Sequence, residues 1–152
     1  MRVDKKTGEL IPERMAAYTQ RMRKGWQMVR KYGFFTLKEE SVLNALADHI
    51  NYQNEIREGE EPMTPASMAR AIGEDGHNFL KTLKSLQRKN AVGCWKSYEV
   101  EIWYVNPALY RRGRGHKDIA GAFASTARER EREGAKAFNL PHERYYSSLL
   151  RP

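Results

Sequence analysis

The residues best suited to chemistry in this chain lie between positions 64 and 90, and their chemistry is that of base recognition. Asn78 can pair bidentately with adenine, and Lys81 can reach the acceptor atoms of guanine. His77 adds a third polar side chain beside them. We expect these three side chains to contact base edges in the major groove of a DNA duplex.

A second set of polar and basic residues is suited to the phosphate backbone, where contacts position a protein without reading sequence. The expected phosphate contacts are Thr64, Ser67, Lys84, Lys96, Arg111, Arg112 and Arg114. Thr82 and Ser85 share the polar face of the same helix and complete the predicted DNA-binding set. The three arginines lie among two glycines, Gly113 and Gly115, which predicts either a mobile basic loop or a plain charged linker.

Two short helices must position these side chains. Thr64 can cap a helix with Pro65 at its first position, and Gly73 can end it. Asp75 can cap the next helix, in which apolar residues recur on one face. The expected core residues of the two helices are Met68, Ala69, Ile72, Phe79, Leu83 and Leu86. This pattern predicts a helix-turn-helix with a polar, basic outer face.

A β-hairpin is expected directly after these helices. Asn90 suits a left-handed helix exit, residues 91–95 are apolar, and residues 98–105 alternate with the period of a strand. Lys96 and Ser97 lie between the two runs and would form the hairpin tip. The fold class that follows is mainly α (α+β), a winged helix-turn-helix with a small hairpin wing. The alternative is an ordinary small α+β core with a solvated basic face.

Further elements are expected before this unit. Thr36 and Glu39 form a capping box for a central core helix that buries Leu37, Val42, Leu43, Leu46, Ala47 and Ile50. Residues 52–63 read as an acidic loop facing away from DNA, and residues 10–11 as an edge strand. Residues 13–31 read as one amphipathic helix that Gly25 weakens. The basic face of that helix either touches phosphate or is simply solvated.

The C-terminal part is expected to be helical. Residues 116–137 form an amphipathic segment with small residues on one face, which could dimerise or pack on its own domain. Residues 138–152 are too apolar for a free tail, so we expect a short docked helix. The predicted organisation is a basic N-terminal arm and helix at 1–35, the winged helix-turn-helix at 36–115 and a helical extension at 116–152.

Charge and composition favour a polyanionic partner. The net charge is +8, and residues 1–35 hold nine Lys or Arg against three acidic residues. Positive charge beside phosphates releases condensed counterions, although solubility alone could also explain a basic chain. The chain has no apolar run of about 20 residues and no secretory signal, and it has one cysteine, Cys94. We therefore expect a cytoplasmic protein with no membrane partner.

No catalytic constellation stands out. There is no glycine-rich phosphate loop, and the four histidines (His49, His77, His116 and His142) are scattered without partner cysteines. Cys94 beside Trp95 is interpreted as a core residue, because a buried free cysteine behaves as a small hydrophobe. We expect no enzyme activity, no metal and no cofactor.

The chain resembles the RepL-type plasmid replication proteins of Gram-positive bacteria and their phage-borne relatives. The resemblance covers about residues 3–115. The residues that carry it are 4–9 (DKKTGE), 31–34 (KYGF), 37–54, the helix-turn-helix at 64–90, 104–107 (YVNP) and 112–113 (RG). It implies a winged-helix protein that binds DNA at a plasmid or phage origin. The family's recognition helix opens with a Ser-Arg-Ser-Thr-like run, where this chain has Asp75, Gly76, His77 and Asn78.

Three functions remain open at this level. The first is a non-catalytic replication initiator that binds an origin as a homodimer and could recruit host replication proteins. The second is a winged-helix transcription regulator, because the same module serves both roles. The third is a protein-interaction adaptor with a degenerate winged helix, which Glu74, Asp75 and Gly76 keep open.

Overall fold

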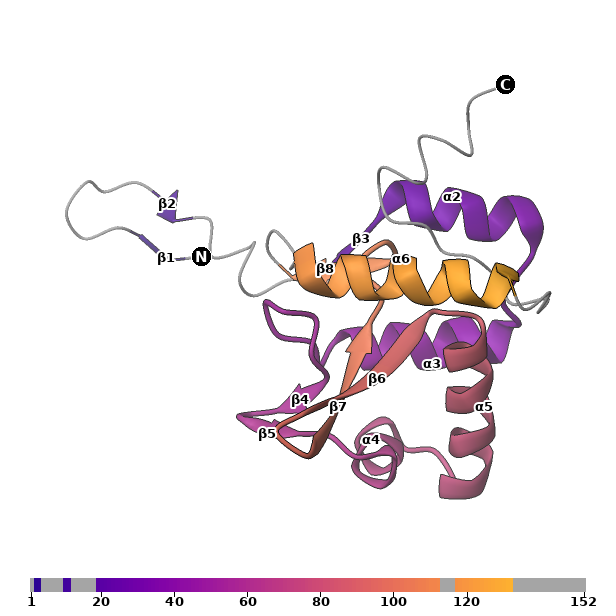
Figure 1. Cartoon of the computed structure of the whole chain (residues 1–152). Helices are drawn as coiled ribbons and strands as arrows, with labels where there is room; N and C mark the ends of the chain where they lie inside the picture. Colours follow the sequence, from indigo (N-terminus) through magenta and orange to yellow (C-terminus); the bar gives the residue numbers. More distant parts are fainter. Residues whose placement is uncertain (1, 4–9, 12–18, 113–116, 133–152) are drawn as a thin grey trace.

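The computed structural model describes residues 2–3, 10–11, 19–112 and 117–132 (Figure 1). Within them, five helices and eight short strands follow one another along the chain. The elements are β1 (Arg2–Val3), β2 (Leu10–Ile11), β3 (Thr19–Arg21), α2 (Arg23–Tyr32), α3 (Leu37–Ala47), β4 (Arg57–Glu58), β5 (Glu61–Pro62), α4 (Pro65–Ile72), α5 (Gly76–Arg88), β6 (Val92–Ser97), β7 (Val100–Val105), β8 (Tyr110–Arg112) and α6 (Lys117–Arg132). All strand pairs are antiparallel, so the predicted α+β class is confirmed.

Helix α3 is the central core helix, as predicted. The Thr36 side chain accepts a hydrogen bond from the Glu39 backbone, and the Glu39 carboxylate accepts one from the Thr36 backbone. The helix buries Val42, Leu43, Leu46 and Ala47, and Ile50 is buried just after it. Leu37 was expected in this core and that prediction is wrong: the side chain is 87% exposed. It is the first residue of the helix and faces away from the packed side.

Helices α4 and α5 begin and end where the sequence predicts. Thr64 caps α4 in a reciprocal pair with Ser67, and Gly73 ends it in the left-handed conformation at φ 74°. Asp75 then caps α5 by accepting a hydrogen bond from the Asn78 backbone. The predicted core residues Met68, Ala69, Phe79, Leu83 and Leu86 are buried, and Ile72 packs against the same core.

Strands β6 and β7 form the predicted hairpin, but its tip lies two residues later than expected. Lys96 and Ser97 still belong to β6, where they pair with Glu101 and Val100. The two tip residues are Tyr98 and Glu99, both with positive φ (50° and 69°). This is the backbone of a type I′ turn, which usually takes Asn or Gly. Tyr98 is 99% exposed at this tip.

A third segment joins this hairpin on the β7 side. Glu55 bridges to Tyr104, and the Ile56 backbone N–H donates to the carbonyl of Trp103 at 2.8 Å. The segment follows α3 and precedes α4 in the chain. Residues 52–63, predicted as one loop, also contain the small hairpin β4–β5, so that part of the prediction is wrong. The pairing of residues 55–56 with β7 attaches the acidic segment at residues 52–63 to the sheet.

The N-terminal region departs most from the prediction. The edge strand at Leu10–Ile11 is confirmed and pairs with β1. However, Thr19–Arg21 form a strand and not helix, and α2 begins only at Arg23. Strand β3 pairs with β8 (Tyr110–Arg112), so Arg111 and Arg112 lie in a strand and not in the predicted mobile loop. Residues 13–18 of the predicted helix lie outside the described residues.

Gly25 was expected to weaken a helix, but the structure gives it a packing role. The glycine is buried near the start of α2, where a Cβ atom would collide with the backbone carbonyl of Ala108. The Trp26 indole N–H donates to the carbonyl of Leu109 at 3.1 Å beside this contact. Helix α2 is therefore held closely against the segment between β7 and β8.

Helix α6 packs on its own domain, which is one of the two arrangements expected for this segment. Phe123 and Ala127 are buried, and the Phe123 ring meets Trp95 edge to face at a centroid distance of 5.0 Å. The Asn90 amide donates to the carbonyl of Phe123 at 2.9 Å. The predicted terminal helix at 138–152 and the rest of the 116–137 segment beyond Arg132 lie outside the described residues. Dimerisation stays a prediction.

Candidate nucleic-acid interface

The outer face of α5 carries an uninterrupted polar and basic stripe. His77, Lys81, Lys84 and Arg88 follow one another at spacings of four, three and four residues, and all four are exposed. At 1.5 Å per residue the stripe is about 16 Å long. The buried residues Phe79, Leu83 and Leu86 occupy the opposite side of the helix. Packing of the apolar face therefore fixes the direction in which this stripe points.

Asn78 lies at the N-terminal end of α5, next to His77. Its side chain is exposed, while its backbone N–H is held by Asp75 at 3.2 Å. The cap therefore anchors the backbone and leaves the amide side chain facing solvent. His77, Asn78 and Lys81, the residues predicted to contact bases, are brought together in the first turns of the helix.

The two hydroxyl residues of α5 are engaged within the protein. Thr82 donates to the carbonyl of Asn78 at 3.1 Å, along its own helix. Ser85 donates to the Glu39 carboxylate of α3 at 2.6 Å. Their role in DNA binding stays a prediction, and the structure gives Ser85 a second task in joining α5 to α3.

Glu39 joins α3 to the C-terminal part of α5, and sequence reasoning identified only its capping role. One carboxylate oxygen accepts from Lys89 at 2.6 Å and from the Thr36 backbone at 2.8 Å, while the other accepts from Ser85. Burial alone would raise the pKa of the Glu39 carboxyl. The hydrogen bonds from Lys89, Ser85 and Thr36, with the charge of Lys89, outweigh burial and lower its pKa below the usual value.

The predicted phosphate contacts outside α5 fall into separate places. Thr64 and Ser67 lie at the start of α4, and each uses its hydroxyl in the reciprocal cap. Lys96 is exposed near the hairpin tip, opposite Glu101 and close to Glu99. The tip therefore presents mixed charge, in contrast to the basic stripe of α5.

The arginines after β7 are not gathered with α5. Arg111 donates to the carbonyl of Pro107 at 3.0 Å, and Arg112 donates to the carbonyl of Ile50 at 2.9 Å. Figure 1 shows β8 well separated from α4 and from the N-terminal end of α5. Arg114 lies outside the described residues. The predicted phosphate contacts of Arg111 and Arg112 would need a surface other than the one that α5 presents.

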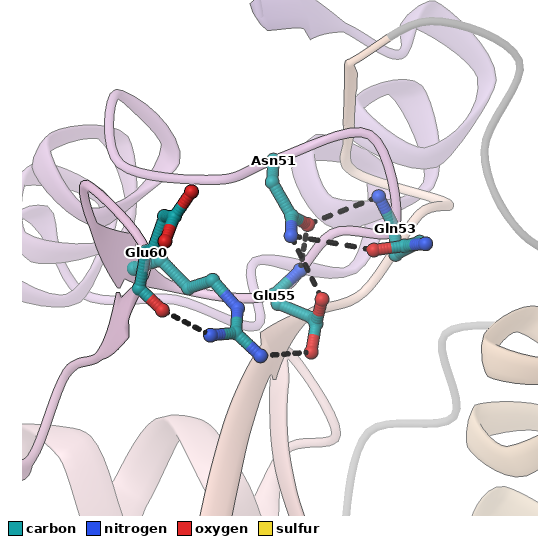
Figure 2. A network of polar contacts seen from close by, with 5 residues as sticks. Asn51, Gln53, Glu55 and Glu60 are labelled. Carbon is teal, nitrogen blue, oxygen red and sulfur yellow. Dashed lines mark hydrogen bonds and ion pairs between the residues drawn. The ribbon is translucent and has the colours of Figure 1, made fainter.

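Several acidic residues of the described body have internal partners. Glu74, in the turn between α4 and α5, forms an ion pair with Lys38 of α3. Figure 2 shows the loop before β4, where Asn51 binds both Gln53 and Glu55. Arg57 donates to the Glu55 carboxylate at 2.9 Å and to the carbonyl of Glu60 at 2.6 Å (Figure 2). These contacts neutralise part of the acidic stretch within the protein.

Three buried asparagines hold the sheet and helices together, and sequence reasoning missed one of them, Asn54. Asn54 donates to the carbonyls of Val105 and Tyr110 at 2.9 and 2.7 Å. Asn106 donates to the carbonyl of Asn90 at 2.8 Å. Asn90 and Asn54 also have positive φ (64° and 63°), which Asn tolerates better than most residues. An asparagine at the end of an element only weakly indicates such a buried role, because asparagine is common in loops generally.

Within the part of the chain that the structure describes, the metal-ligating side chains are dispersed and the one cysteine has a raised pKa. Among the described residues, no three His, Cys, Asp or Glu side chains gather closely enough to hold a metal ion. Burial raises the pKa of the Cys94 thiol, and the negative charge of Glu101 raises it further. A thiol in that environment is a poor nucleophile at neutral pH. No described helix combines the length and apolar character needed to cross a membrane.

A scan against protein-family models, a search of curated proteins and a search of solved structures each give no match for this chain.

Proposed function

We propose that this protein is a sequence-specific DNA-binding protein whose residues 36–112 form a winged helix-turn-helix. The element order supports this interpretation. Helix α3, the segment at residues 55–56, helices α4 and α5, and the hairpin β6–β7 follow one another along the chain. The 55–56 segment pairs with β7, which pairs with β6. A helix-turn-helix followed by a hairpin of this kind is the arrangement that a winged helix requires.

The observation that carries the proposal is the stripe on α5. A helix with its side chains is about 10–12 Å across, and the major groove of B-DNA is about 12 Å wide. His77 and Lys81 lie near the N-terminal end of α5, the end from which a recognition helix usually contacts bases. Lys84 and Arg88 continue the positive charge along the helix. In this docking, Asn78 and Lys81 read bases while Lys84 contacts phosphate.

The biological role proposed first is replication initiation at a plasmid or phage origin, without catalysis. The resemblance to RepL-type replication proteins supports this role. A homodimer on a two-fold symmetric site, acting in the cytoplasm with host replication proteins, would fit such a function. Transcription regulation is the alternative, because the same interface would serve a promoter.

The adaptor hypothesis depended on Gly76 and on the acidic residues Glu74 and Asp75 before α5. Glu74 is neutralised by Lys38, and Asp75 has a structural task as the helix cap. Each of these two acidic residues therefore has a role within the protein, and neither needs a protein partner to explain it. DNA binding is therefore the better-supported function.

The deciding experiment is an affinity selection with the full-length protein on fragmented DNA from its replicon and host, at near-physiological salt. Enrichment of one cluster at an origin supports the initiator, and enrichment at promoters supports the regulator. If no fragment is enriched and binding vanishes above low salt, only non-specific electrostatic attraction remains, and sequence-specific recognition is refuted.

A further inference from the structure

Helix α2 carries a second basic surface that the proposed docking of α5 leaves unused. Its sequence RKGWQMVRKY contains four basic residues and no acidic residue. Arg23, Gln27 and Arg30 follow at spacings of four and three residues, so they lie on one side of the helix, and all three are exposed. Lys24 and Lys31 are also exposed and border this side. We call Arg23, Gln27, Arg30 and Lys31 the α2 basic face.

The orientation of this face is fixed by the other side of the helix. Trp26, Met28 and Val29 are buried at 3%, 5% and 1% exposure. The close contact of Gly25 with Ala108 and the hydrogen bond from Trp26 to Leu109 hold the helix in place. The α2 basic face therefore points away from the protein body and needs no rearrangement to meet a partner.

The same burial argues against a membrane as the partner. An amphipathic helix binds a bilayer by inserting its apolar face below the headgroups. In α2 that apolar face forms part of the protein core, together with residues of α3 and α5. Only the charged side is available, and it can meet a polyanion but cannot insert into lipid.

The spacing of the charges suits a phosphate backbone. Arg23 and Arg30 are seven residues apart, or about 10.5 Å along the helix axis. Guanidinium groups bind phosphate through a planar pair of donors, whereas a solvated lysine acts as a point charge. Just before the helix, Arg21 is also exposed, and its guanidinium lies 4.0 Å from the ring centroid of Trp26. The positive charge of α2 therefore extends to Arg21, on the N-terminal side of the helix.

The two basic surfaces lie in different parts of the molecule. In Figure 1, α2 lies on one side of α3, and α4 with the N-terminal turn of α5 lies on the other. A straight duplex that occupies the first turns of α5 would be held away from α2 by the protein body. We propose that the α2 basic face binds the phosphate backbone of a second DNA duplex, without sequence preference, so that one protein molecule connects two duplex segments.

The test compares the full-length protein with a double variant, Arg23→Gln and Arg30→Gln. The matched control is Arg70→Gln with Arg128→Gln, which removes the same charge from exposed positions on α4 and α6. A duplex bound to beads is loaded with protein and washed, and a labelled duplex of unrelated sequence is added at near-physiological salt. Circular dichroism and thermal melting check that each variant is folded.

We expect the wild type and the control to capture the labelled duplex, and the α2 variant to lose most of that capture while it still binds the first duplex. In a titration of random-sequence duplex against salt, the slope of log affinity should fall by about 1.8, because each phosphate contact contributes about 0.9. Equal capture and equal slope for the α2 variant and wild type would refute the proposal. Loss of binding to anionic phospholipid vesicles, with DNA capture unchanged, would refute it in favour of a membrane.

Discussion

Asn78 is the side chain of α5 best placed to identify a base, since it is exposed while its backbone is anchored by Asp75. We expect Asn78→Ala to cost about 1–3 kcal/mol of binding free energy on the selected site, because a bidentate contact with adenine is lost. Affinity for other sequences should change little. Competition binding with base-substituted sites measures this difference.

Lys84→Gln is the matched comparison for that prediction, because Lys84 lies on the same exposed stripe but is assigned to phosphate. It should weaken binding to all sequences alike and lower the salt dependence. If Asn78→Ala instead weakens every sequence equally, Asn78 contacts the backbone and the proposed register of α5 in the groove is wrong.

The hairpin tip stores backbone strain at Tyr98 and Glu99. A residue other than glycine in the left-handed conformation costs about 1–2 kcal/mol. Glycine removes that cost but loses more entropy on folding, so Glu99→Gly should stabilise the protein by about 0.5–1 kcal/mol. Glu101→Gly changes the same residue type within β7 and should destabilise, because glycine weakens a strand. A denaturant midpoint that does not rise for Glu99→Gly would contradict this account.

Individual caps and turns show what local sequence can predict. Thr36, Thr64, Gly73 and Asp75 were all assigned correctly, because a cap depends on residues within three or four positions. The hairpin tip was misplaced because neither Tyr98 nor Glu99 is a usual type I′ turn residue. There, the pairing of β6 with β7 prevails over the local preference of the two tip residues.

The junction of α3 and α5 depends on one carboxylate. Glu39 belongs to the capping box of α3. Its carboxylate also accepts hydrogen bonds from Ser85 and Lys89, at the C-terminal end of α5. Its folded-state pKa is lowered, so the interaction stabilises the protein above the ordinary glutamate pKa of 4.5. That contribution is lost as the pH falls from about 4.5 through the lower folded-state pKa.

Glu39→Gln should therefore lower the free energy of unfolding at pH 7 by about 1–3 kcal/mol, because hydrogen bonds to a charged group are lost. It should also flatten the dependence of stability on pH in the acid range below 4.5. Urea titrations at a series of pH values measure both effects. Glu40→Gln, at the next and more exposed position, is the control. If the free energy of unfolding of Glu39→Gln still falls below pH 4.5 as steeply as that of the wild type, this carboxylate is not the titrating group.

Elements that depend on distant partners were the ones that sequence could not predict. Thr19–Arg21 fit a helical pattern locally, but they pair with Tyr110–Arg112, about ninety residues away in the chain. The Ser85 contact with Glu39 joins residues 46 positions apart. Periodicity carries no information about such pairings, whereas it does predict the buried faces of α3, α4 and α5. The candidate base contacts and the helix that carries them were therefore predictable, but the contact of Ser85 with Glu39 that joins this helix to α3 was not.

At the scale of the whole molecule, α2 shares a core with the helices that were expected to form a separate domain. Trp26, Met28 and Val29 belong to the same buried cluster as Leu43 of α3 and Leu83 of α5. Trp26 also meets Tyr110 edge to face at 5.7 Å between centroids. A division at residue 35 would cut through this cluster, so we expect α2 and the rest of the described body to unfold together.

The three tryptophans allow a direct test of that expectation. Trp26 lies in α2, Trp95 packs on α6, and Trp103 lies in β7. A variant with Trp95→Phe and Trp103→Phe reports only on α2 by fluorescence, while far-ultraviolet circular dichroism reports on all helices. Coincident urea midpoints for the two signals are expected, because two-state unfolding makes all probes coincide. A fluorescence change at lower urea would instead mean that α2 detaches first, and the second basic surface would then be carried by an independently folding arm.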